Sequence, residues 1–362
     1  MKTIKQICSI VLFLVILSTI IYYENEIIKY KMPYGIVQYE GFYAQPKGSI
    51  DVLFMGTSHV YADIDPAYVY DESGILSYDL ASGGIGIWGT YYSLEQALQY
   101  QKPKVVVIDV FGAILGDYYN SQREIVDASY RIKDPKIKYQ LLQCLCEGTD
   151  NSVFEMWLAF PWYHTLYNDI NRYDFPEYKN IAYYGGEDFS YLYPDDKIVT
   201  YKGTTTLLRE YIPENILDID EIDSEQKISD RALEYLNKIV QLAEEHNIQV
   251  CFVSAPFLQG MTKDQQMQVN YIKNVFCEET HCIFLDANLS NDEIGIIWES
   301  DLADREHLNY LGAEKYSRWL GKKIKALYEL PDNRGTDKAA SWDTNLEWQN
   351  SICHADNSDN GG

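Results

Sequence analysis

Short apolar runs alternate with segments of helical periodicity in two parts of this chain. Buried strands are predicted for residues 50–55, 104–110, 248–254 and 283–286, and a weaker one for 76–80. The spacing of apolar residues predicts helices over 88–100, 228–246, 265–279 and 310–328. Strands that alternate with helices form right-handed βαβ units, so we predict an α/β fold with three αβα layers around a parallel sheet.

The alternation stops between about residues 115 and 227, in a stretch rich in Tyr, Asn, Asp and Pro. Because this stretch is too long for a plain loop, we expect a large insertion within a domain at 49–330. The insertion is expected to pack on the carboxyl edge of the sheet and to shape a binding site. Residues 331–362 are rich in Asp, Asn, Gly and Ser, which predicts a disordered acidic tail.

The first apolar run, residues 7–23, contains no charged residue and lies at the short limit for crossing a bilayer. Lys2 and Lys5 precede the run and two glutamates follow it, which predicts a cytoplasmic N-terminus and an extracellular body. A cleaved signal peptide is the alternative, but residues 22–26 offer no small residues for a cleavage site. We therefore expect a signal-anchor helix at 1–23 in the cell membrane, followed by a polar stalk at 24–48.

Charge and cysteine usage exclude several classes of protein. The formal net charge is −24, which argues against a nucleic-acid partner because phosphate binding needs a basic face. We find no ligand spacing for a metal and no Gly-rich phosphate signature, so no metal and no cofactor are expected. Of the seven cysteines, Cys277 and Cys282 either pair across a helix end or are separate buried thiols.

A Gly-Thr-Ser-His segment (56–59) directly follows the first predicted strand. Ligands of open parallel sheets bind at the carboxyl ends of the strands, so Ser58 is expected at the crevice. If a helix begins there, its free N–H groups can stabilise an oxyanion formed by attack of Ser58. The alternative is that Ser58 merely caps that helix.

A second candidate segment, Asp-Arg-Glu-His (304–307), follows the last predicted strand. At this spacing Asp304 can accept a hydrogen bond from the imidazole of His307 and orient its other nitrogen toward a nucleophile. The alternative is a surface aspartate beside a solvated histidine. Because both segments follow strands of one sheet, we expect His307 to face the crevice that contains Ser58.

These two segments together resemble the SGNH (GDSL-type) hydrolase superfamily. The resemblance covers about residues 48–115 and 228–328 and implies a flavodoxin-like αβα fold. It implies that Ser58 is the nucleophile, that His307 is the general base and that Asp304 orients His307. It also implies an oxyanion hole made by the backbone N–H groups of Ser58 and of one glycine in residues 82–86, with Gly84 as first choice.

The sequence departs from the pattern of that family in two blocks. The first block is Gly-Thr-Ser rather than Gly-Asp-Ser, and residues 109–112 are Asp-Val-Phe-Gly, without the asparagine that supplies an oxyanion donor in the family. Loss of one such donor costs on the order of 100- to 1,000-fold in rate. These departures motivate an alternative in which the domain is catalytically inactive and binds envelope glycan or a membrane O-acyltransferase.

The closer resemblance is to membrane-anchored SGNH-like proteins of Gram-positive cell envelopes, the type that serves lipoteichoic-acid D-alanylation. They share one N-terminal anchor, a Gly-[Ser/Thr]-Ser block followed by a proline (here Pro66) and a late Asp-x-x-His. The resemblance implies a serine esterase or O-acyltransferase that acts on acyl esters of an envelope polysaccharide or teichoic-acid-like polymer. It also implies a membrane-bound O-acyltransferase as partner.

Three further residues are candidates for contact with a substrate. His59 adjoins the nucleophile, although neighbouring side chains in a tight turn often point apart. Asp109 ends a strand at the crevice and either binds substrate or caps a turn. His164 lies in an aromatic segment (160–164) that either stacks on sugar rings or anchors the insertion.

Overall fold

The computed structural model describes residues 2–28, 36–117, 125–126, 128–129, 131–158, 198–219 and 221–353. Five described strands form one parallel sheet in the order β2-β1-β3-β6-β7, which is the flavodoxin-like order. Their bounds are β1 (Val52–Gly56), β2 (Ser77–Ala81), β3 (Val105–Asp109), β6 (Gln249–Ser254) and β7 (Ile283–Asp286). All five predicted strands and the α/β fold class are confirmed.

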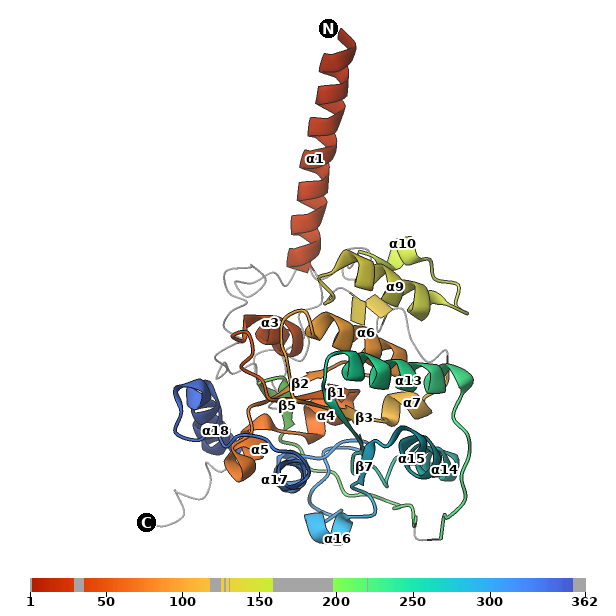
Figure 1. The fold of residues 1–362 in the computed structure, drawn as a ribbon, viewed down its shortest axis with the longest axis vertical. Coiled ribbons are helices and arrows are strands. Elements are labelled where there is room, and N and C mark those ends of the chain that lie inside the picture. Colours follow the sequence, from red (N-terminus) through yellow and green to blue (C-terminus); the bar gives the residue numbers. More distant parts are fainter. Residues whose placement is uncertain are drawn as a thin grey trace.

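Helices cover both faces of the sheet because apolar side chains point to both sides of its strands (Figure 1). Leu53 and Met55 of β1 belong to the core formed with one helical layer: α6 (Ile87–Ala97), α9 (Pro135–Cys146), α13 (Asp230–Glu245) and α14 (Lys263–Tyr271). Val52 and Phe54 belong to the core of the other layer: α4 (Ser58–Asp63), α5 (Pro66–Ser73) and α17 (Tyr310–Leu327). The alternation along β1 thus produces the three predicted layers.

Shorter described elements complete the fold. They are η1 (Ile36–Gly41), α3 (Phe42–Ala44), α7 (Phe111–Ile114), α10 (Val153–Met156), η5 (Ile272–Phe276), α15 (Cys277–Thr280), α16 (Asn291–Ile294) and η6 (Asp337–Ala339). Elements α14, η5 and α15 are continuous and form the helix predicted over 265–279. Cys277 and Cys282 are both free thiols.

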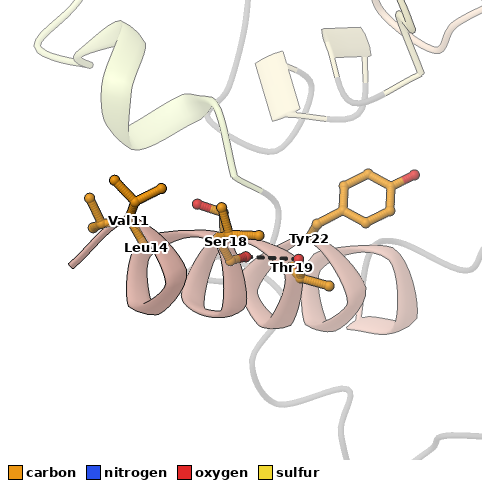
Figure 2. Close-up of a pocket in the computed structure, with 6 residues that line it drawn as sticks. Val11, Leu14, Ser18, Thr19 and Tyr22 are labelled. Carbon is orange, nitrogen blue, oxygen red and sulfur yellow. Dashed lines mark hydrogen bonds between the residues drawn. The ribbon is translucent and has the colours of Figure 1, made fainter. Parts of the chain in front are cut away.

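The N-terminal helix α1 (Lys2–Ile28) extends away from the domain and is long and apolar enough over Thr3–Asn25 to cross a membrane (Figure 1). Figure 2 shows a shallow pocket on α1 that is lined by its own side chains, among them Ser18 and Tyr22. The Thr19 hydroxyl on this face donates to the carbonyl of Val15 at 2.8 Å. Its polar group is therefore satisfied within the helix, as a bilayer requires.

The predicted stalk at 24–48 is wrong for residues 36–48, which pack into the domain. Tyr39 and Phe42 are buried in the same core as α6. The Tyr39 hydroxyl lies 3.1 Å from the hydroxyls of both Ser82 and Ser93. A tyrosine-rich segment thus enters the core because its polar tips find partners there. Residues 29–35 lie outside the described part of the chain.

The predicted disordered tail is also wrong for residues 331–353, which include the helix α18 (Ala340–Cys353). Trp342 is buried against Tyr70 and Leu76, and its indole N–H donates to the carbonyl of Ser77 at 3.0 Å. One aromatic anchor with a satisfied polar group fixes a segment whose composition is otherwise polar. Residues 354–362 lie outside the described part.

A hairpin from the insertion covers the outer edge of β2. Its strands are β4 (Ile198–Tyr201) and β5 (Thr204–Leu207), and the Lys202 carbonyl in the turn accepts from the backbone N–H of Asp79 at 3.0 Å. Pairing of this kind protects an exposed sheet edge. Thr204 Oγ1 also donates to the carbonyl of Ile64 at 3.3 Å, next to α4. The insertion therefore contacts the helix that begins at Ser58.

Candidate active site

The turn between β1 and α4 presents Ser58 at the carboxyl edge of the sheet. Gly56 has φ +152°, and a Cβ there would lie 2.9 Å from the Cβ of Asp109 on the neighbouring strand β3. Thr57 is the N-cap of α4, and its hydroxyl accepts from the backbone N–H of His59 at 3.4 Å. The alternative that Ser58 merely caps the helix is therefore wrong, since Thr57 is the cap and Ser58 is the first helical residue.

Ser58 and His307 meet although 249 positions separate them. Ser58 Oγ lies 2.8 Å from His307 Nε2. The other ring nitrogen, Nδ1, lies 2.9 Å from Oδ1 and 3.1 Å from Oδ2 of Asp304. The structure thus brings a hydroxyl, an imidazole and a carboxylate into one hydrogen-bonded series.

One oxygen of the Asp304 carboxylate is held by its own turn. Its Oδ1 accepts from the backbone N–H groups of Glu306 at 2.8 Å and His307 at 3.0 Å, so the three-residue spacing creates a local hydrogen-bonded loop. Asn309 then caps α17 by accepting from the N–H groups of Leu311 and Gly312.

Opposing effects act on the pKa of Asp304. Burial raises this pKa, but the hydrogen bond and charge of His307, with a smaller contribution from Arg209, hold the pKa well below the usual range of a carboxyl. Asp304 is therefore ionised at neutral pH, and an ionised carboxylate accepts a hydrogen bond from the imidazole N–H of His307.

The loop that follows β2 lies beside the turn that carries Ser58. The loop after β2 is placed by a hydrogen bond from Ser82 N–H to the Gly56 carbonyl at 3.1 Å, and Gly84 in this loop has φ +61°. Within the described residues, no backbone carbonyl accepts a hydrogen bond from the N–H group of Ser58 or of Gly84. An oxyanion needs backbone donors of this kind.

His59 and Asp109, the two described candidates for substrate contact, are both about 1% exposed. The His59 ring packs against both Phe111 and Phe257 at centroid distances of 4.4 and 4.6 Å and lies edge-on to His307 at 5.6 Å. Burial, with the nearby His307 charge, lowers the pKa of His59 well below its usual value, so its ring is neutral.

The Asp109 carboxylate accepts hydrogen bonds from the backbone around it. It accepts from the N–H of Phe111 at 3.2 Å and from that of Ala255 at 3.4 Å, and burial raises its pKa to about 7. Both side chains are enclosed, so the predicted substrate contacts of His59 and Asp109 are not supported by their positions. The third candidate, His164, lies outside the described residues.

Sequence reasoning missed Arg209, which lies 95 positions from Asp304 in the insertion. Its Nη2 donates to Asp304 Oδ2 at 2.6 Å. No local sequence pattern indicates this contact, since residues 208–210 have no regular secondary structure.

Comparisons with known proteins add little to this geometry. No family model and no curated protein matches the chain. A matching solved structure is described as a "putative acylhydrolase" from Bacteroides fragilis NCTC 9343, with 10% identity and a TM-score of 0.35, over 78% of this chain and 90% of that one. At this TM-score the likeness is weak, and the fold class rests on the strand order and layers described above.

Proposed function

We propose that this chain is a membrane-anchored, SGNH-like serine esterase or O-acyltransferase. The observation that carries the proposal is the continuous series from Ser58 Oγ through His307 to Asp304, with contacts of 2.8 and 2.9 Å. This is the arrangement that activates a serine hydroxyl for attack on a carbonyl.

The proposed reaction has two steps. Ser58 Oγ attacks an ester carbonyl while His307 Nε2 takes the hydroxyl proton, and the N–H groups of Ser58 and Gly84 bind the oxyanion. The ester C–O bond breaks, and the leaving alcohol receives the proton from His307. The acyl group on Ser58 is then transferred to water, in an esterase, or to a hydroxyl of a second substrate, in a transferase.

The N-terminal helix supports a substrate near the membrane. A domain tied to a bilayer through Thr3–Asn25 reaches polymers that lie close to that surface. We propose acyl esters of a cell-envelope polysaccharide or a teichoic-acid-like polymer as the substrate class, with a membrane-bound O-acyltransferase as partner.

A fluorophosphonate probe tests the proposal because it forms a covalent bond only with an activated serine. We expect labelling of the full chain at Ser58, no labelling of Ser58→Ala, and labelling of His307→Gln slowed on the order of 1,000-fold or more. Ser152→Ala, at the N-cap of α10, is the control and should label like the wild type.

A folded wild-type chain that the probe does not label would contradict the enzyme. That outcome would favour the alternative in which the domain binds envelope glycan or a membrane O-acyltransferase. The missing asparagine donor, whose place after β3 is taken by Phe111, is the observation that keeps this alternative open.

A further inference from the structure

The two oxygens of Asp304 are held by different parts of the chain. Oδ1 accepts from the backbone N–H groups of Glu306 and His307 and from the imidazole. Oδ2 accepts from Arg209 at 2.6 Å and lies farther, 3.1 Å, from His307 Nδ1. Arg209 is therefore the closest donor to the oxygen that the local turn leaves free.

Solvent reaches this carboxylate, which makes the outside donor important. The side chain of Asp304 is 32% exposed and that of Arg209 is 42% exposed. Water competes for an exposed carboxylate oxygen and allows the group to rotate. A guanidinium fixes it better than water does, because its donors are rigidly arranged and its bond is charge-assisted.

Arg209 lies between two anchored points of the insertion. On one side, Thr204 at the start of β5 donates to Asp79 Oδ2 at 3.0 Å. On the other side, the backbone N–H of Tyr211 donates to the carbonyl of Leu302 at 2.8 Å and forms an isolated bridge to the loop that carries Asp304. The backbone on both sides thus places Arg209 against Asp304.

We infer that Arg209 is a positioning residue, which holds the Asp304 carboxylate so that His307 stays directed at Ser58. This inference rests on the proposed function and extends it to the insertion. Through Arg209, the insertion supports the hydrogen-bonded series of Ser58, His307 and Asp304. Arg209 itself does not contact the reacting atoms.

The first test compares rates of fluorophosphonate labelling in the full chain. Loss of the charge-assisted bond frees Asp304 Oδ2, so Arg209→Gln should label about 10-fold more slowly than the wild type. Arg209→Lys keeps the charge and should recover part of the rate. Arg305→Gln removes the same charge from an exposed neighbour of Asp304 and should label within about 2-fold of the wild type.

Two further readouts separate positioning from a general loss of structure. Millimolar guanidinium should accelerate the labelling of Arg209→Ala and leave Arg305→Ala unchanged. Added salt should slow the wild type more than Arg209→Gln, because a half-exposed ion pair is screened. Equal slowing of Arg209→Gln and Arg305→Gln, or no rescue by guanidinium, would overturn the inference.

The last readout does not depend on activity. The His307 Nδ1 proton, bonded to Asp304, should give a downfield proton NMR resonance that is absent in His307→Gln. Arg209→Gln should broaden this resonance, whereas Arg305→Gln and Ser58→Ala should keep it. If the wild type resists the probe but the resonance still depends on Arg209, the proposed function fails and the positioning role stands; an unchanged resonance in Arg209→Gln refutes that role.

Discussion

At the scale of single residues, the position of the nucleophile depends on the close approach of Gly56 to Asp109 and Val60. Gly56 lets β1 turn toward Ser58 at φ +152°, where a side chain would meet the Cβ of Asp109 at 2.9 Å and Val60 Cγ2 at 3.1 Å. Asp109 cannot give way easily, because both its oxygens accept backbone hydrogen bonds. The glycine is therefore required by both dihedral angle and space.

Gly56→Ala should lower the free energy of unfolding by about 2–4 kcal/mol and slow labelling at Ser58, because strain and overpacking add at this turn. Urea unfolding measures the first effect and the probe the second. Gly295→Ala, at φ +78° with no atom within 4 Å of the added Cβ, is the control for the dihedral angle alone. Equal losses in the two variants would contradict the role given to packing.

Some features of the site could be predicted from the sequence, and others depend on contacts between distant residues. The spacing of Asp304 and His307, and the position of Ser58 after a buried strand, are local patterns that indicate their geometry from the sequence. The position of Arg209 depends on its contact with Asp304, and the enclosure of Asp109 depends on its contact with Ala255. Both partners lie far along the chain. Local pattern carries no information about such partners.

At the scale of elements, the pattern of buried apolar residues explains which strands and helices could be predicted from the sequence. β1 and β3 were predictable because each is a short, mainly apolar run whose residues are all buried, whereas β2, with Ser77 and Asp79, gave a weaker pattern. The segment α18 was not, because its burial depends on Trp342 and on polar contacts such as Gln349 Nε2 to Thr206 Oγ1 at 2.7 Å. Composition alone therefore suggested disorder for a helix that holds the β4–β5 hairpin.

Lys202 in that hairpin gives a test by pH. Its Nζ donates to Gln45 Oε1 at 3.0 Å and Ser341 Oγ at 2.8 Å and lies 3.8 Å from the ring centroid of Trp342. Burial lowers its pKa to about 7. The unfolded chain keeps this proton up to about pH 10.4, so between these pH values it binds more protons than the folded chain.

The free energy of unfolding should therefore rise with pH between about 7 and 10, relative to Lys202→Met, by at most about 1.4 kcal/mol per pH unit. Below pH 7 the difference between the two proteins should stay constant, since Lys202 is then charged in both states. Urea unfolding at a series of pH values measures this difference. Parallel curves for the two proteins across the whole range would show that Lys202 stays charged when buried.

At the scale of the whole molecule, the N-terminal helix α1 and the domain are in contact. Ile27 near the end of α1 packs against the core that includes α6, and Asn25 is buried. If α1 crosses a bilayer over its candidate span, which ends at Asn25, the domain begins where the helix leaves that bilayer. A reaction at Ser58 would then take place close to one membrane surface, and the orientation of α1 decides which surface that is.

The charges that flank the apolar run 7–23 predict that surface. Lys2 and Lys5 precede this run and should stay in the cytoplasm, which places the domain outside. Protease added to intact spheroplasts should therefore digest the domain of the wild type. The double variant Lys2→Glu, Lys5→Glu should protect a larger fraction, whereas Lys47→Glu in the domain should not. A wild-type domain that is digested only after permeabilisation would reverse the orientation and, with it, exclude an extracellular polymer as the substrate of Ser58.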